Sequence, residues 1–122
     1  MVSSICYASL AIYAKRDREE EIAGLLGDTP TLTGERRGIF SCIYSTRGVV
    51  ESASIEEHLQ CIKDKFSDAT QALVRLSGDG CEMRIWIYFG VAETNHAFVL
   101  QDGFIRWIAS FGADVCVDAW GK

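Results

Sequence analysis

Strict alternation of apolar and polar or aromatic residues marks the two clearest β-strands. In the first, at 5–13, Cys6, Ala8, Leu10 and Ile12 share one side, and Tyr7, Ser9, Ala11 and Tyr13 share the other. In the second, at 82–89, Met83, Ile85, Ile87 and Phe89 point one way, and Glu82, Arg84, Trp86 and Tyr88 point the other. Further strands are predicted at 39–45, 96–100 and 113–120. On the last of these, Val115, Val117 and Ala119 are expected to face the core, and Asp114, Cys116, Asp118 and Trp120 to face away.

Apolar residues at helical spacing predict helices between the strands. The first, at 17–26, has the stripe Ile22, Leu25 and Leu26 and ends before Gly27. The second begins at Ser54 and carries Ile55, Leu59, Ile62, Phe66, Ala69 and Leu73; Ser67-Asp68 could divide it, and the pattern leaves this open. The third begins at Asp102 as its cap and carries Phe104, Ile105, Ile108 and Phe111. Asp17 with Glu20 and Ser54 with Glu57 have the spacing of capping boxes. Residues 28–38 predict a loop, and 77–80 a turn.

This order of elements predicts one α+β domain over residues 1–122. Alternating strands have one buried side, which amphipathic helices can cover. The expected architecture is a two-layer α/β sandwich with one mostly antiparallel sheet of about five strands and helices on one face. The order reads β-α-β-α-β-β-α-β, and its β-α-β-β-α-β part is typical of a ferredoxin-like arrangement.

The composition narrows the possible functions. The 122 residues carry a net charge of −5, which argues against nucleic acid as a partner and suits a basic protein partner. No apolar run approaches a membrane span, and the N-terminus does not have the pattern of a signal peptide, so a cytoplasmic protein is expected.

Few residues suggest chemistry. The five cysteines are widely spaced without a C-x-x-C pair, which disfavours disulfides and a zinc site. His58 and His96 are the two histidines, and His58 is expected to be a half-buried structural residue. A Ser41–His58–Asp triad can be imagined, but no nucleophile-elbow sequence supports it. No phosphate, dinucleotide or metal motif occurs, so we expect no catalytic residue, no metal, no cofactor and no enzymatic activity.

The uncovered side of the sheet is the candidate binding surface. The alternation places large aromatic and charged residues there, the types that dominate protein interfaces. The candidate partner-binding residues are Trp86, Tyr88, Arg84, Asp114, Asp118 and Trp120, with the acidic turn Glu19, Glu20 and Glu21 as a further contact with a basic partner. Packing of these aromatics within the chain, or dimerisation through them, are the alternatives.

Several short strings, in order, resemble the bacterial domain-of-unknown-function family 4279. They are Tyr7-Ala-Ser-Leu, Leu25-Leu-Gly with Pro30, Ser54-Ile-Glu-Glu-His-Leu, and Asp102-Gly-Phe-Ile leading through Phe111-Gly to the last strand. The chain departs from the family where Phe40-Ser41 replaces Trp-Ser and where Trp120 replaces tyrosine. The resemblance implies a cytosolic α/β domain without an established activity. It also suggests the small acidic immunity proteins of contact-dependent growth inhibition and polymorphic toxin systems.

Two functions are therefore expected. The first is an immunity protein that binds and neutralises a cognate, basic toxin domain in the cytoplasm. The second is a homodimeric ligand-binding or regulatory domain without catalytic activity.

Overall fold

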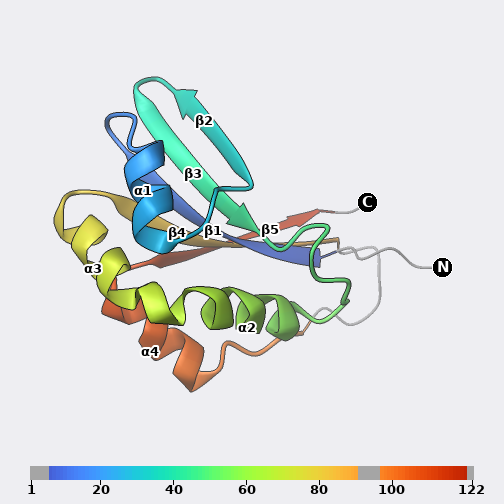
Figure 1. Ribbon diagram of the computed structural model, residues 1–122. Helices are drawn as coiled ribbons and strands as arrows, with labels where there is room; N and C mark the ends of the chain where they lie inside the picture. The colour runs from blue at the N-terminus through green and yellow to red at the C-terminus, as the bar shows by residue number, and fades with distance from the viewer. Residues whose placement is uncertain (1–5, 91–96, 121–122) are drawn as a thin grey trace.

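The computed structural model describes residues 6–90 and 97–120, which form one sheet with helices beside it (Figure 1). In chain order the elements are β1 (Cys6–Ala14), α1 (Glu19–Leu26), β2 (Leu32–Arg36), β3 (Ile39–Ser45), α2 (Ile55–Phe66), a 3₁₀ turn (Ser67–Ala69), α3 (Thr70–Gly78), β4 (Glu82–Gly90), α4 (Asp102–Ser110) and β5 (Asp114–Trp120). The predicted α+β class is confirmed.

The five strands lie in the order β2-β3-β1-β4-β5. All neighbours are antiparallel except β4 and β5, which are parallel. The unit from β1 to β4 is β-α-β-β-α-β with the order β4-β1-β3-β2, which is the ferredoxin-like arrangement. From the sequence, this unit was predicted to begin with the strand at 39–45. In the structure it comprises Cys6–Gly90, and α4 and β5 extend it beyond β4.

The core lies between the sheet and the helices. On the helix side of β1 and β4, Leu10, Ile12, Ile85 and Ile87 have no exposed surface. They pack in one cluster with helix residues that include Ile22, Leu59, Ile62, Phe66, Leu73 and Phe111. Burying each such side chain contributes about 1.5–3 kcal/mol, so the one-sided placement of the helices follows from the apolar stripes.

Helix ends follow the sequence in part. Gly27, with a φ of 72°, ends α1 as predicted, because glycine adopts this left-handed conformation without strain. Neither capping box forms. Asp17 accepts a hydrogen bond from the amide of Glu19 (3.1 Å), and Ser54 bonds the Glu56 carboxylate (3.1 Å). The division of the second helix at Ser67–Ala69 is resolved in favour of two helices.

Strand β2 was predicted as loop, and that prediction is wrong. All five of its residues are exposed, so no apolar alternation reveals it. It pairs with β3 through a tight turn at Arg37 and Gly38, whose φ angles are 55° and 82°. Positive φ at both positions is the requirement of a type I′ hairpin turn.

The predicted strand at 96–100 is also wrong over its described part. Residues 97–100 form no strand, and His96 lies outside the described residues. The amide of Val99 donates to the Glu56 carboxylate at the start of α2 (2.9 Å), and Phe98 contacts Phe89 edge to face. This segment is therefore held by side chains of other elements and not by a strand neighbour.

The buried apolar residues of α4 and β5 differ from those predicted. In α4, Ile105 is 45% exposed and Trp107 takes its place in the core, because residues 104, 107, 108 and 111 share one side of the helix. In β5, Val117 and Ala119 are exposed and not buried. β5 is the outermost strand, so it is flanked by a neighbour on one side only.

Candidate functional site

The sheet has an open face, which we define as the side away from α1–α4. Cross-strand register decides which residues meet there. Tyr7 lies opposite Tyr88, and Ser9 lies opposite Trp86, on the antiparallel pair β1 and β4. On the parallel pair β4 and β5, Tyr88 lies beside Asp118. Residues of three strands are thus brought together without any helix over them.

Four aromatic side chains form a continuous row across this face: Tyr7, Tyr88, Trp86 and Tyr13, here called the aromatic row. The rings of Tyr7 and Tyr88 stack with centroids 4.4 Å apart, and those of Trp86 and Tyr88 stack at 5.9 Å. The indole N–H of Trp86 donates to the Tyr13 hydroxyl (2.9 Å). All four residues are half-buried, so the row presents ring surface to solvent and is held in place by mutual contact.

Two arginines lie over the row. The guanidinium of Arg84 is 5.6 Å from the Tyr13 ring centroid and 5.8 Å from that of Trp86. The guanidinium of Arg47 lies 5.2 Å from the Tyr7 ring. These are cation–π distances. Arg84 was predicted as a site residue, whereas Arg47 was missed, because it follows β3 and reaches the row from a loop.

The carboxylates at the margin of the row come from β5. Asp114 pairs with Arg84, and Asp118 pairs with Tyr88, in the parallel register; both aspartates are exposed. Trp120 is opposite Gly90 in the same register, and its side chain lies outside the described part. A depression of about 260 Å³ adjoins the Tyr13 end of the row and includes Lys15, Ile39 and Glu82.

The acidic turn Glu19, Glu20 and Glu21 is not part of this surface. It begins α1, whose Ile22 and Leu26 pack into the core on the helix side of the sheet. The structure therefore brings together the strand residues of the predicted site and places the three glutamates on the other side. The separation is consistent with the predicted placement of the helices on the buried side of the sheet, so the prediction that the glutamates and the strand residues form one site is wrong.

Tyr88 offers a test of the open face by titration. Burial, followed by the proximity of Tyr7, raises the pKa of the Tyr88 phenol to about 12 from its ordinary value of 10.0. An unfolded tyrosine ionises first, so this contribution to stability is complete below pH 10 and is lost as the pH rises towards 12. When the pH is raised from 9 to 11, the free energy of unfolding, measured with urea, should decrease less for Tyr88→Phe than for the unaltered protein. The difference between the phenolate absorbance titrations of the two proteins should have its midpoint near 12; a midpoint near 10 contradicts the assignment.

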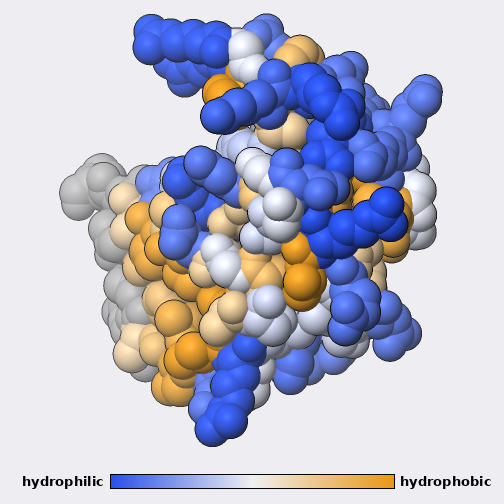
Figure 2. All heavy atoms as spheres, turned by 90° about the vertical axis from the view of Figure 1, so that its left-hand side faces the viewer, coloured by the Kyte–Doolittle hydropathy of each residue, from blue (hydrophilic) through white to orange (hydrophobic). Residues whose placement is uncertain are grey.

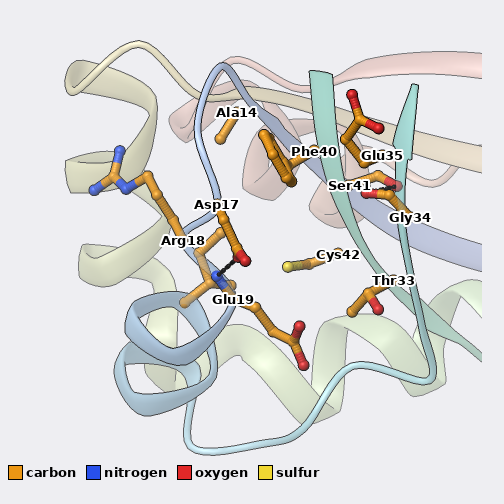
Figure 3. Close-up of a pocket in the computed structure, with 11 residues that line it drawn as sticks. Ala14, Asp17, Arg18, Glu19, Thr33, Gly34, Glu35, Phe40, Ser41 and Cys42 are labelled. Atoms are coloured by element: carbon orange, nitrogen blue, oxygen red, sulfur yellow. Dashed lines mark hydrogen bonds between the residues drawn. The ribbon is translucent and has the colours of Figure 1, made fainter. Parts of the chain in front are cut away.

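A second concave site lies on the helix side, between the β2–β3 hairpin and the start of α1 (Figure 3). We call it the hairpin pocket. Its volume is about 190 Å³, and its lining residues are Ala14, Asp17, Arg18, Glu19, Ile22, Thr33, Gly34, Glu35, Phe40, Ser41 and Cys42. Hydrophilic side chains cover most of the upper part of the molecule, where the hairpin lies (Figure 2).

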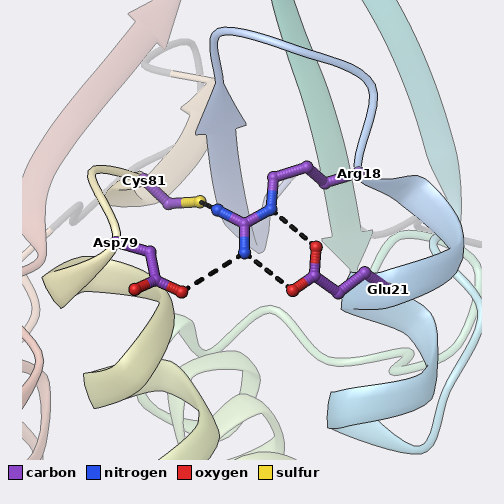
Figure 4. Close-up of polar contacts among 4 residues, drawn as sticks. All are labelled: Arg18, Glu21, Asp79 and Cys81. Carbon is purple, nitrogen blue, oxygen red and sulfur yellow. Dashed lines mark hydrogen bonds and ion pairs between the residues drawn. The ribbon is translucent and has the colours of Figure 1, made fainter.

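The Arg18 side chain does not point into the hairpin pocket but into a polar cluster behind it (Figure 4). Its guanidinium forms two hydrogen bonds of 2.8 Å with Glu21, one of 3.4 Å with Asp79, and one of 3.3 Å with the sulfur of Cys81. The bonds to Glu21, above all, raise the pKa of Arg18, and they lower the pKa of Glu21. The cluster joins the start of α1 to the end of α3 and the start of β4.

Removal of the Arg18 cluster should weaken the fold. Arg18 is 8% exposed. Arg18→Met removes the guanidinium and its hydrogen bonds but keeps most of the packing of the aliphatic part of the side chain. We expect the free energy of unfolding to fall by about 2 kcal/mol. Urea unfolding measures this, with Arg16→Met, an exposed neighbour, as the matched control. Equal stability of the two variants would show that the cluster is not stabilising.

His58 lies in a buried hydrogen-bond network at the start of α2. It is fully buried, its Nδ1 lies 2.5 Å from the Thr46 hydroxyl, and its Nε2 lies 2.8 Å from the carbonyl oxygen of Ser52. Both ring nitrogens are therefore occupied, and the Ser41 hydroxyl donates instead to Gly34 (3.5 Å). The imagined Ser41–His58–Asp triad does not form, and His58 is more buried than predicted.

The cysteines are free thiols. Burial, followed by the negative charges of Glu19 and Asp17, raises the pKa of Cys42 to about 11, which disfavours the nucleophilic thiolate at neutral pH. Among residues 6–90 and 97–120, no group of three or more His, Cys, Asp or Glu side chains is arranged to hold a metal ion. Within the same residues, every helix is too short or too polar to cross a membrane.

The fold and the open face define a two-layer α+β domain with a ferredoxin-like unit and an exposed aromatic sheet surface. Residues 4–122 match the family described as a domain of unknown function, DUF4279. The chain belongs to this family, as its sequence resemblance indicated. Comparison with curated proteins and with solved structures gave no match.

Proposed function

We propose that this chain is an immunity protein, which binds one cognate toxin domain in the cytoplasm through the open face and neutralises it. The observation that carries the proposal is the aromatic row on a sheet surface without a helix over it: three stacked rings and Tyr13, all half-buried, with two arginines over them. Such surfaces combine large contact area with polar groups, which is the composition of interface hot spots.

Charge supports a basic partner. The chain carries a net charge of −5, and Asp114 and Asp118 stand exposed at the margin of the row. Opposite net charge accelerates encounter with a basic domain, and exposed carboxylates can accept hydrogen bonds from its lysines and arginines. The Ser41 hydroxyl donates to the Gly34 carbonyl and burial raises the pKa of Cys42 to about 11, so neither is activated as a nucleophile, which favours binding over catalysis.

The proposal is tested by capture and by protection. The tagged chain is isolated from its native cells, and the co-purified protein is identified. That protein is then produced in a sensitive host with and without the chain. We expect a basic protein that stops growth alone and permits growth when the chain is present.

The double variant Trp86→Ala, Tyr88→Ala should lose both capture and protection, while Ile105→Ala, on the exposed side of α4, should keep both. Circular dichroism and urea unfolding establish that the double variant is folded. Capture that is unaffected by the double variant overturns the assignment of the open face, and a captured protein without toxicity overturns the immunity function.

The second candidate function is a homodimeric ligand-binding or regulatory domain. The depression of about 260 Å³ beside Tyr13 and Arg84 favours it, because a concave surface next to the aromatic row offers space for part of a small molecule. Sedimentation at micromolar concentration separates the candidates: a stable dimer, abolished by Trp86→Ala, supports this one.

A further inference from the structure

The hairpin pocket has two chemically different parts. Its rim carries two exposed carboxylates, those of Asp17 and Glu19 at the start of α1, whereas the Glu35 carboxylate accepts a hydrogen bond from the amide of Gly38 in the hairpin turn (2.7 Å). Its floor contains apolar surface, including the half-buried ring of Phe40. A ligand that suits both parts has an alkyl stem and a cationic end.

Cys42 points into this pocket (Figure 3). It is 4% exposed, and no residue in the described part of the chain forms a hydrogen bond with its thiol. A buried sulfur that faces an acidic cavity without a hydrogen-bond partner can accept a weak hydrogen bond from a ligand that enters the pocket. This feature is independent of the carboxylates, since it comes from a strand and from the floor.

The chain itself shows which cation such a set of groups binds. The guanidinium of Arg18 is held by two carboxylates and one cysteine sulfur, those of Glu21, Asp79 and Cys81 (Figure 4). The hairpin pocket offers the same kinds of acceptor: the carboxylates of Asp17 and Glu19 and the sulfur of Cys42 (Figure 3). The two sites adjoin one another at Arg18, the N-cap residue of α1.

The volume of the hairpin pocket and the spacing of its carboxylates indicate which kind of cation it can bind. The carboxylates of the described residues are not clustered closely enough to hold a metal ion. A volume of about 190 Å³ is also below the roughly 300–1,000 Å³ of typical small-molecule pockets. A planar guanidinium, with donors spread along its edges, can reach separate carboxylates.

We propose that the hairpin pocket binds the guanidinium group of an arginine side chain presented by a partner protein. The alkyl stem of the arginine lies along Phe40, and its guanidinium donates to Asp17, Glu19 and the sulfur of Cys42. The pocket lies on the helix side of the sheet, so this contact is separate from the open face. It goes beyond the proposed function by assigning a second recognition surface.

The probe for this site is Nα-acetyl-L-arginine amide, titrated into the ¹⁵N-labelled protein and followed by NMR. We expect saturable shifts centred on the amides of Thr33, Gly34, Ser41 and Cys42. The corresponding citrulline amide, which has the same shape but no charge, should bind at least about tenfold more weakly, because hydrogen bonds to charged groups are the stronger ones.

Two further comparisons identify the source of the arginine and the acceptors. Free L-arginine should bind more weakly than its amide, since its carboxylate is repelled by the acidic rim; tighter binding of the free amino acid overturns the assignment to a partner's side chain. The variant Glu19→Gln should bind the amide at least about tenfold more weakly. The matched control Glu20→Gln changes the net charge equally, uses an exposed glutamate outside the pocket, and should bind normally.

Absence of saturable shifts, equal binding of the citrulline amide, or equal loss in both glutamine variants overturns the proposal. These outcomes leave the open face untouched, because the probe and the variants do not include any residue of the aromatic row. Conversely, failure of Trp86→Ala, Tyr88→Ala to affect capture would leave the arginine titration unchanged.

Discussion

Replacement of His58 by leucine is expected to lower the free energy of unfolding by about 3 kcal/mol. His58 has no exposed surface, and it holds the loop between β3 and α2 through Thr46 and Ser52. The Ser52 carbonyl can only accept, so Nε2 of His58 carries the hydrogen. The Thr46 hydroxyl bonds Nδ1 and also lies 3.2 Å from the Ala8 carbonyl oxygen. Thr46 in turn accepts from the amide of Ala8 (3.0 Å), which ties the loop to β1. Leucine fills a similar volume but removes both ring nitrogens, and with them the hydrogen bonds that join α2 to Thr46 and Ser52.

The measurement is the urea midpoint, followed by tryptophan fluorescence. Gln60→Leu, on the exposed side of the same helix, provides the matched control for the apolar substitution and should change stability by less than about 0.5 kcal/mol. Thr46→Val should reproduce a large part of the His58→Leu loss, because it breaks the same network. A loss below about 1 kcal/mol for His58→Leu would mean that the loop finds other hydrogen bonds.

Trp86→Ala should weaken binding to the captured partner by about 2–3 kcal/mol, which is roughly 30- to 150-fold in the dissociation constant. Trp86 lies inside the aromatic row: it stacks on Tyr88, donates to Tyr13 and lies beneath Arg84. Its truncation therefore removes contact area and releases three neighbours at once. The substitution should mainly increase the dissociation rate. The association rate should change little, because the net charge is unchanged.

Trp86→Phe separates ring area from the hydrogen bond. Phenylalanine keeps most of the stacking surface and loses the N–H that Tyr13 accepts, so binding should weaken less than about fivefold. Both affinities are measured by calorimetry or surface binding at fixed salt. A change below threefold for Trp86→Ala would remove the aromatic row from the interface.

The period of two residues made the open face predictable. In β4, the alternation from Glu82 to Phe89 assigned Arg84, Trp86 and Tyr88 to one side, and the structure places all three there. The same alternation predicted β1 correctly. Backbone geometry alone fixes which side chains share a face, so this part of the site needs no knowledge of distant contacts.

The hairpin pocket could not be predicted in the same way. One of its walls is β2, a strand with only exposed residues, and the opposite wall is the first turn of α1. The burial of Arg18 likewise depends on Asp79 and Cys81, which are far away in the sequence. Both features arise from the docking of separate elements, which local propensity does not encode.

The parallel pairing of β5 with β4 has a consequence for synthesis on the ribosome. The four strands from β1 to β4 complete their sheet by Gly90, but the outer rim of β4 acquires its partner only when 114–120 have emerged. Until then a nascent chain presents a bare strand of alternating isoleucines and aromatics, which is a template for pairing with another polypeptide. Translation that stalls or ends early within α4 should therefore yield an aggregation-prone fragment. In the full-length chain, β5, which carries two aspartates, pairs with this edge of β4.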